Sequence, residues 1–327
     1  MNNRNASASA FGWDFQVNAA ILLMLENIRE ANAIRVEGKD EDIELSLRDH
    51  TKIYSQAKAI NNPLDTSNVL KKLSDALNTL HLASHNADAI IFTYITNSMN
   101  PFNDNNSIGL FSHITHLSFD ELPEKCQKKI NNIIKKHQYS QLDTSKLDIR
   151  VLPFYGKDFK NRYKHILERV NSFINELKIY DNGIGEDILK IWQNDLFHNA
   201  TITDTSINVD KKEFIWSLVV VVLEHTSAND YKKNFSDDQC EEVEQKYKCI
   251  INFQSNLFEF VTKVISDYTK SRLSPKSYVE QKWLHYTNLI ENIDAENDIR
   301  ESLIKIILYK IINKHNKINL IKKELKL

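Results

Sequence analysis

The feature that most constrains the fold is an alternation of apolar and polar residues in three short segments near the N-terminus. The segments cover residues 34–37, 42–47 and 52–58. Because residues i and i+2 of a strand share one face, this pattern predicts three strands, each with an apolar and a polar side. Residues 38–41 separate the first two segments, and a connection of this length predicts a hairpin.

Four polar side chains are expected to converge on the polar side of these strands. Glu37 and Asp42 would face each other across the hairpin. Gln56 and Lys58 would point the same way from the third strand, and neighbouring strands lie about 4.8 Å apart. The four side chains would then share one small patch. An ordinary hairpin with a solvated charged face is the alternative interpretation.

Such a patch has a chemical use, because carboxylates that face each other on a sheet repel. A divalent cation removes that repulsion, and Mg²⁺ prefers oxygen ligands while it retains water. Bound Mg²⁺ can polarise a phosphoryl oxygen and lower the pKa of a bound water. Lys58 would stabilise charge on the phosphate or help to deprotonate the attacking water. The patch therefore predicts metal-assisted cleavage of a phosphodiester.

The segments around these strands predict an α/β domain. Residues 13–31 predict a helix before the hairpin, and residues 67–82 carry leucines at helical spacing. Residues 89–95 form a β-branched and aromatic run that is typical of a buried central strand. The resulting order, αβββαβ with a mixed sheet, is that of the core of restriction-endonuclease-like nucleases.

The same segments resemble a known family. Residues 12–16 (Gly-Trp-Asp-Phe-Gln) are similar to the G-(F/W)-x-(F/Y)-Q opening of the double-stranded DNA endonuclease domain of bacterial anti-phage effectors. Residues 36–43 resemble its V-E-x(n)-D-D-I segment, residues 54–58 its Q-x-K strand, and residues 91–97 its strand ending in T-N. That domain belongs to the PD-(D/E)XK superfamily. The resemblance covers roughly residues 11–155 and is strongest to the nuclease subunit of Lamassu-type, SMC-containing defence systems.

The resemblance implies a role for each site residue. Asp42 would bind the metal, Gln56 would take the (D/E) position as a second metal ligand, and Lys58 would be the catalytic lysine. Gln16 occupies a helix position where some relatives have Glu. Glu37 would be a fourth member and metal ligand, with ion pairing to a basic neighbour in the hairpin as its alternative role. Glutamine oxygens carry no charge, so we expect weak Mg²⁺ dependence or a preference for Mn²⁺.

The resemblance also implies a function and partners. We expect a metal-dependent DNA endonuclease that is the effector subunit of a bacterial anti-phage or anti-plasmid defence complex. It would be inactive with its partner subunits and active after release or oligomerisation. The expected partners are double-stranded DNA, an SMC-like ATPase and an accessory subunit from the same operon, and further copies of the chain. A non-catalytic structural or DNA-binding subunit with a degenerate nuclease fold is the alternative, and RNA is a further candidate substrate.

Composition limits how the chain could meet nucleic acid. The 327 residues suffice for about two domains, with 42% hydrophobic and 26% charged residues. Only six glycines and five prolines are present, which favours long helices. The net charge of −2 excludes a global basic field, so nucleic acid would have to bind a local patch or an assembled oligomer.

The second half of the chain reads as helical. Residues 182–185 (Asn-Gly-Ile-Gly) are the clearest break in the chain. We therefore predict a nuclease domain over residues 1–180 and an all-α oligomerisation or partner-docking domain over residues 181–327. Five helices are expected in the second domain, over residues 184–197, 211–224, 237–268, 275–293 and 295–326.

Two features of this half admit a partner-binding and a packing interpretation. Residues 192–197 and 211–216 resemble a C-terminal module of proteins encoded beside SMC-like ATPases, which implies docking. Equally, Trp192 and Trp216 could pack between helices. The last 27 residues hold seven Lys and two Glu among regularly spaced apolar residues. They could meet DNA, a membrane surface or a partner, but we favour a packed C-terminal helix with solvated lysines.

Several features predict a cytoplasmic protein that does not enter a membrane. The three cysteines are too few and too badly spaced for a zinc site or a disulfide framework. The N-terminus lacks the apolar segment of a signal peptide. The longest apolar run, residues 214–223, is half the ~20 residues that a membrane span needs, so we expect a buried helix there.

Overall fold

The computed structural model describes residues 7–158, 160–179, 183–233, 235–253, 257–291 and 293–327. The chain groups into two compact units. The first contains residues 1–176 and 189–211, and the second contains residues 177–188 and 212–327. The functional division into residues 1–180 and 181–327 stays a prediction. Residues 180–182, at the start of the predicted break, lie outside the described residues.

A mixed seven-stranded sheet forms the centre of the first unit. Its order is β5-β6-β4-β3-β2-β1-β7, with β4 parallel to both of its neighbours and every other pair antiparallel. The α/β class and the mixed sheet are thereby confirmed. The strands are β1 (Ala31–Val36), β2 (Ile43–Leu47), β3 (Lys52–Lys58), β4 (Ala89–Thr96), β5 (Thr115–Ser118), β6 (Leu147–Val151) and β7 (Val209–Asp210).

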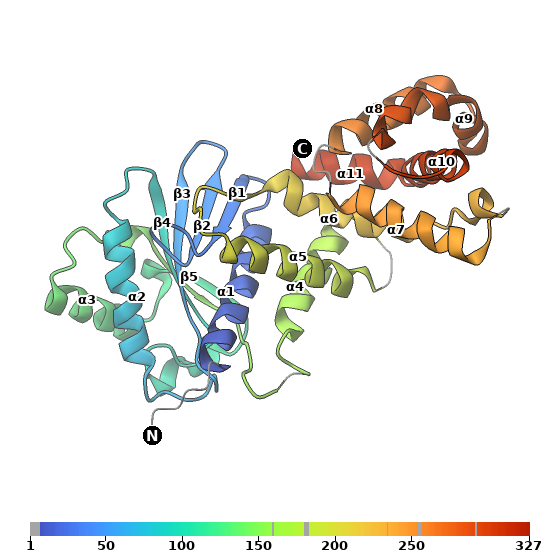
Figure 1. Cartoon of the computed structure of the whole chain (residues 1–327). Helices are drawn as coiled ribbons and strands as arrows, with labels where there is room; N and C mark the ends of the chain where they lie inside the picture. Colours follow the sequence, from blue (N-terminus) through green and yellow to red (C-terminus); the bar gives the residue numbers. More distant parts are fainter. Residues whose placement is uncertain (1–6, 159, 180–182, 234, 254–256, 292) are drawn as a thin grey trace. The chain divides into compact units, whose positions relative to one another are not determined.

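Helices cover both faces of this sheet. In Figure 1, α2 and α3 lie on one side of the sheet and α1 lies on the other. The chain passes through α1, β1, β2, β3, α2 and β4 in the predicted order of helix, three strands, helix and strand. The helices are α1 (Ser7–Glu26), α2 (Val69–Ala83), α3 (Glu124–His137), α4 (Lys164–Glu176) and α5 (Ile184–Thr201).

Helix α1 is apolar on almost every side because it is buried on almost every side. All residues from Ala19 to Leu25 are buried, and the helix contacts β1, β2, β3 and α4. Among the described residues, α1 is the one helix long and apolar enough to cross a membrane by length and composition. Its burial identifies it as a core helix. The cytoplasmic location stays a prediction.

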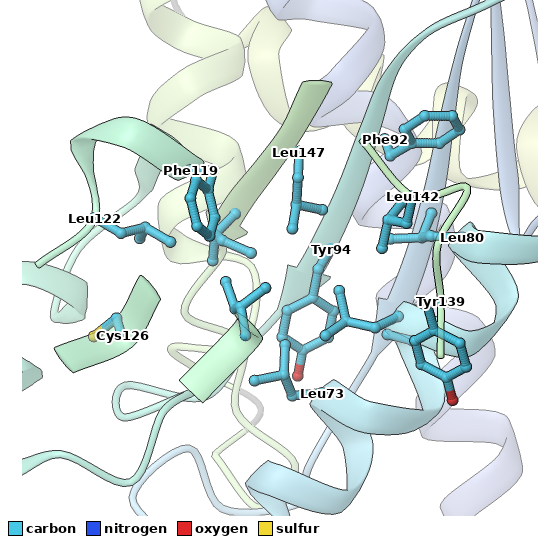
Figure 2. Close-up of a cluster of buried hydrophobic side chains, with 14 of the residues drawn as sticks. Leu73, Leu80, Phe92, Tyr94, Phe119, Leu122, Cys126, Tyr139, Leu142 and Leu147 are labelled. Atoms are coloured by element: carbon cyan, nitrogen blue, oxygen red, sulfur yellow. The ribbon is translucent and has the colours of Figure 1, made fainter. Parts of the chain in front are cut away.

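A hydrophobic cluster fills the space between the sheet and α2 and α3. Figure 2 shows Tyr94 of β4 and Leu73 of α2 within this cluster. Tyr54 of β3 belongs to the cluster as well. Because alternate residues of a strand share a face, Gln56 and Lys58 lie on the same side of β3 as Tyr54. The apolar core therefore gives way to polar side chains toward the end of β3.

The second unit is all-α, as predicted. Helix α6 has the predicted bounds, whereas residues 237–268 form two helices instead of one, with residues 254–256 outside the described part. The last predicted helix is also divided, at Lys314, whose backbone leaves the helical region. The helices are α6 (Lys211–Glu224), α7 (Asp237–Phe253), α8 (Leu257–Ser271), α9 (Pro275–Lys282), η5 (Trp283–Ile290), α10 (Asn297–Asn313) and α11 (His315–Leu325).

The two tryptophan-containing segments and the lysine-rich C-terminal segment, for which docking and packing were the alternatives, both take part in packing. Trp192 is fully buried, and the indole of buried Trp216 donates a hydrogen bond to the Ile251 carbonyl at 2.7 Å. Helix α10 buries most of its apolar residues, and α11 buries Ile318 and Ile321. The aromatic residues and the C-terminal helices therefore stabilise the fold itself.

Candidate functional site

The β1–β2 hairpin brings the two predicted carboxylates together. The Glu37 amide donates to the Asp42 carbonyl at 2.8 Å, and the Gly38 amide donates to the Glu41 carbonyl at 2.9 Å. Glu37 and Asp42 therefore face each other, as predicted. Glu37 lies in the left-handed region with φ 53°, which turns the chain directly after β1.

Three groups at the end of β3 contact a single oxygen of Asp42. The Gln56 amide nitrogen donates to Asp42 Oδ2, and the Ala57 backbone amide donates to the same atom at 3.0 Å. Lys58 Nζ lies 3.7 Å from it. The acid before β2 and the Q-x-K triplet of β3 thus meet, as the strand pattern predicted.

Gln56 is held at both ends of its amide group. The side chain is 3% exposed, and its Oε1 accepts a hydrogen bond from the Thr79 hydroxyl of α2 at 2.6 Å. Its NH₂ group, not its oxygen, therefore faces Asp42. A half-turn of the amide would bring the oxygen toward Asp42. Thr79 could then accept from Gln56 while it donates to the Ala76 carbonyl, which lies 3.0 Å away.

Gln16 of α1 joins this group from the other side of the sheet. Burial raises the pKa of both Glu37 and Asp42, and hydrogen bonds from the Gln16 amide oppose the shift in each case. The Lys58 charge is the larger opposing effect at Asp42. Gln16 Oε1 is buried and accepts no hydrogen bond from the described residues. All five predicted site residues therefore lie in one connected group.

Glu41 is a sixth member that the sequence did not single out. It is 4% exposed, and neither carboxyl oxygen has a hydrogen-bond partner among the described residues. Burial and the Asp42 charge raise the pKa of Glu41 to about 8, against smaller effects of the nearby Thr79 hydroxyl and Lys58. Turn carboxylates are normally solvated, so the pattern marked residue 41 only as part of a turn. Residues 36–43 are similar to a motif with two successive acidic residues, and this similarity could have marked Glu41 beside Asp42.

The side chains near Asp42 that could ligate a metal, Glu37, Glu41 and Gln16, offer oxygen atoms, which suits Mg²⁺ or Mn²⁺. The buried Gln16 Oε1 is an acceptor without a donor, and a cation would satisfy it. However, the described part of the chain holds no group of three or more His, Cys, Asp or Glu placed to hold a metal ion. Asp42 and Glu37 would therefore share the ion with amide oxygens and water. These residues fit a weakly held, hydrated cation, and the metal stays a prediction.

A second lysine adds positive charge beside Lys58. Burial and the charge of Lys58 lower the pKa of Lys72 on α2. Lys72 also lines a pocket of about 270 Å³ together with Ile60 and Asn61, which follow β3. An anionic group that reached the end of β3 would therefore meet two lysines. The sequence predicted a helix over residues 67–82 but did not mark Lys72.

Comparisons with known proteins place the chain in no family. No family model matches the sequence, and no curated protein matches it. The solved structures that resemble the chain include two of the Acinetobacter baumannii Cap4 SAVED/CARF-domain containing receptor, one with the cyclic trinucleotide 2'3'3'-cAAA and one with 3'3'3'-cAAA. Each is 12% identical over 65% of this chain, with TM-scores of 0.39 and 0.40. The chain spans 45% and 48% of those receptors, and a likeness this low says nothing about its own ligand.

These findings correct the predicted family. The structures found are cyclic-trinucleotide receptors, not a PD-(D/E)XK nuclease subunit of a Lamassu-type system, and that assignment is wrong. The function drawn from it, a DNA endonuclease effector activated by release or oligomerisation, is wrong with it. So are the predicted partners: double-stranded DNA, an SMC-like ATPase with its accessory subunit, and further copies of the chain. The alternative of a non-catalytic subunit with a degenerate nuclease fold is not supported either. The motifs were short, and hairpins with charged residues in unrelated proteins can have the same sequence pattern.

Proposed function

We propose that the group around Asp42 hydrolyses a phosphodiester with the help of a divalent cation. The observation that carries this proposal is the convergence of Gln56, the Ala57 amide and Lys58 on one oxygen of Asp42. The proposal concerns the chemistry and does not choose the phosphodiester. The dependence of this hydrolysis on Mg²⁺ or Mn²⁺ stays a prediction.

The side chains supply three parts of such a reaction. Gln56 and the Ala57 amide hold the Asp42 carboxylate in one orientation, so little reorganisation is needed when an ion binds. The Lys58 ammonium is placed to stabilise negative charge on a phosphate beside Asp42. Asp42, Glu37 and Gln16 would hold the cation. When bound, the cation would polarise a phosphoryl oxygen and lower the pKa of a water.

The element order supports a narrower prediction about the fold. An acid directly before β2 and a Q-x-K triplet at the end of β3 occupy one end of neighbouring strands, between α1 and α2. A restriction-endonuclease-like core has this order. The order is compatible with other mixed sheets as well, so the narrower fold stays a prediction.

The test is hydrolysis by the purified full chain with Mg²⁺, Mn²⁺ or EDTA. The substrates are bis(4-nitrophenyl) phosphate, a generic phosphodiester, and fluorescent single-stranded oligonucleotides of DNA and of RNA. We expect hydrolysis that requires the cation and falls about 100-fold or more in Asp42→Asn, because the variant loses the carboxylate that holds the ion. Product analysis on the oligonucleotides identifies which phosphodiester is cut.

The matched control is Asp49→Asn. Asp42 precedes β2, and Asp49 follows the other end of this strand. Asp49 is exposed, and within the described part of the chain it accepts hydrogen bonds only from the amide and hydroxyl of Thr51 in its own turn. We expect D49N to keep the wild-type rate within about twofold. Equal rates in D42N and D49N, or no hydrolysis of any substrate by folded wild-type protein, would contradict the proposal.

A further inference from the structure

The second unit contains a pocket that the proposed hydrolysis does not use. It has a volume of about 510 Å³ and lies between the end of α6, the η4 turn (Asn229–Lys232), α7 and α10. This volume is within the range of small-molecule sites. The pocket lies wholly among residues of the second unit.

Two hydroxyl groups on the wall of this pocket have no hydrogen-bond partner within the described residues. Tyr247 of α7 is 6% exposed, and its hydroxyl is buried. The Thr226 hydroxyl, after the end of α6, is also buried and unpaired. Burial of an unpaired hydroxyl costs free energy, so native structures seldom keep two on one wall without a partner.

A lysine charge lies beside Tyr247 in the same pocket. Lys310 Nζ of α10 is 4.3 Å from the centre of the Tyr247 ring, and it forms no ion pair with the described residues. By contrast, Lys232 on the same wall is neutralised by Glu244, whose carboxylate is 2.6 Å away. Burial lowers the pKa of Lys310, and the charge of Glu224, which also lines the pocket, opposes this shift without pairing directly with Lys310. Lys310 and Lys248, which also lines the pocket, form no ion pair with the described residues, and Lys310 is the one that lies over the Tyr247 ring.

We propose that this pocket binds a small organic anion. Its phosphate or carboxylate group would lie between the Lys310 ammonium and the hydroxyls of Tyr247 and Thr226. Its apolar part would lie against the buried side chains of Val243 and Ile306, which line the same pocket. A charged donor together with neutral hydroxyl donors is the usual set for an oxyanion.

The test uses two anions that share one ring. Phenyl phosphate and benzoate are titrated into the full chain to about 20 mM and followed by saturation-transfer NMR, with benzyl alcohol as the neutral analogue. We expect at least one anion to bind with a Kd of about 1 mM, as suits ligands of this size, and benzyl alcohol to bind at least tenfold more weakly. The stronger anion identifies the group that the pocket prefers.

Variants assign the binding to the proposed groups. Lys310→Met should weaken the binding of the more tightly bound anion about tenfold or more, and Tyr247→Phe should weaken it about fivefold. Lys263→Met is the matched control, because Lys263 lies 5.9 Å from the Tyr286 ring, outside this pocket, and its loss should leave the affinity unchanged. Cooperative melting of each variant shows that it is folded, and Y247F carries the test if K310M does not fold.

Three results would overturn the proposal. They are the absence of binding by both anions at about 20 mM, equal binding of benzyl alcohol, or wild-type affinity in folded K310M and Y247F. The proposal does not depend on hydrolysis. Asp42→Asn should bind the anion as wild-type protein does, so failure of the hydrolytic proposal leaves this one standing.

Discussion

At the scale of single residues, Glu41 is the most unusual feature of the molecule. A buried carboxyl without hydrogen bonds is stable only when it is neutral, and burial raises the pKa of Glu41 to about 8. Its ordinary pKa in an unfolded chain is 4.5. Between these values the unfolded state releases this proton while the folded state keeps it. The contribution of Glu41 to the free energy of unfolding is therefore fully present below about pH 4.5 and is lost as the pH rises through about 8.

This linkage gives a prediction for Glu41→Gln in metal-free buffer. Glutamine is always neutral, so the variant should be more stable than wild type at about pH 8.5, by up to a few kcal/mol, and close to wild type at about pH 5. Denaturant unfolding at the two pH values measures the difference. The pKa values of Glu37 and Asp42 are raised too, so part of the pH dependence should remain in the variant. A stability difference that is the same at both pH values would contradict this account.

The residues of the site were predictable to different degrees. The alternation of β3 placed Gln56 and Lys58 on one face, and the hairpin length placed Glu37 opposite Asp42. Glu41 was not predictable, because its burial depends on α2, whose Thr79 comes close only in the folded unit. The orientation of the Gln56 amide also depends on that contact.

At the scale of elements, Asn97 joins three segments at the end of β4. Its Oδ1 accepts from the Ile60 amide at 2.7 Å, and its Nδ2 donates to the carbonyls of Ile60 and Phe154, each at 2.6 Å. Ile60 follows β3, which carries Lys58, and Phe154 follows β6. This fully buried amide therefore holds together the chain segments that leave three neighbouring strands.

Replacement of Asn97 by Ala should destabilise the first unit. The variant would leave buried backbone groups without partners, at a cost of roughly 2–4 kcal/mol, which denaturant unfolding measures. Asn78→Ala is the control, since Asn78 is an exposed residue of α2 and its loss should cost less than about 0.5 kcal/mol. An effect of N97A no larger than that of N78A would show that the junction does not depend on this amide.

Elements with strong periodicity were predicted better than elements made by tertiary pairing. The bounds of β3 and α6 agree with the predicted ranges, because their patterns are regular throughout. β7 was missed because it has two residues, and only pairing with β1 makes it a strand. The division of residues 295–326 was missed because apolar spacing continues across Lys314 while the backbone does not.

At the scale of the whole molecule, the positions of the site side chains were more predictable than the protein family. The net charge of −2 leaves no long-range field, so an anionic substrate would depend on local charges such as those of Lys58 and Lys72. The short motifs placed side chains correctly because strand geometry dictates where they point. They misidentified the family because the same geometry arises in unrelated proteins. Function at this scale must therefore be argued from each site separately.

The most direct test of the hydrolytic account compares two lysines of one strand. Lys58 and Lys52 both belong to β3 and have side chains 28% and 30% exposed, but Lys52 lies at the other end, 3.4 Å from Glu44. The measurement is the rate of Mn²⁺-dependent hydrolysis of bis(4-nitrophenyl) phosphate by Lys58→Met and Lys52→Met. The account predicts a loss of about 100-fold or more in K58M and less than about twofold in K52M. Equal rates in the two variants would contradict it.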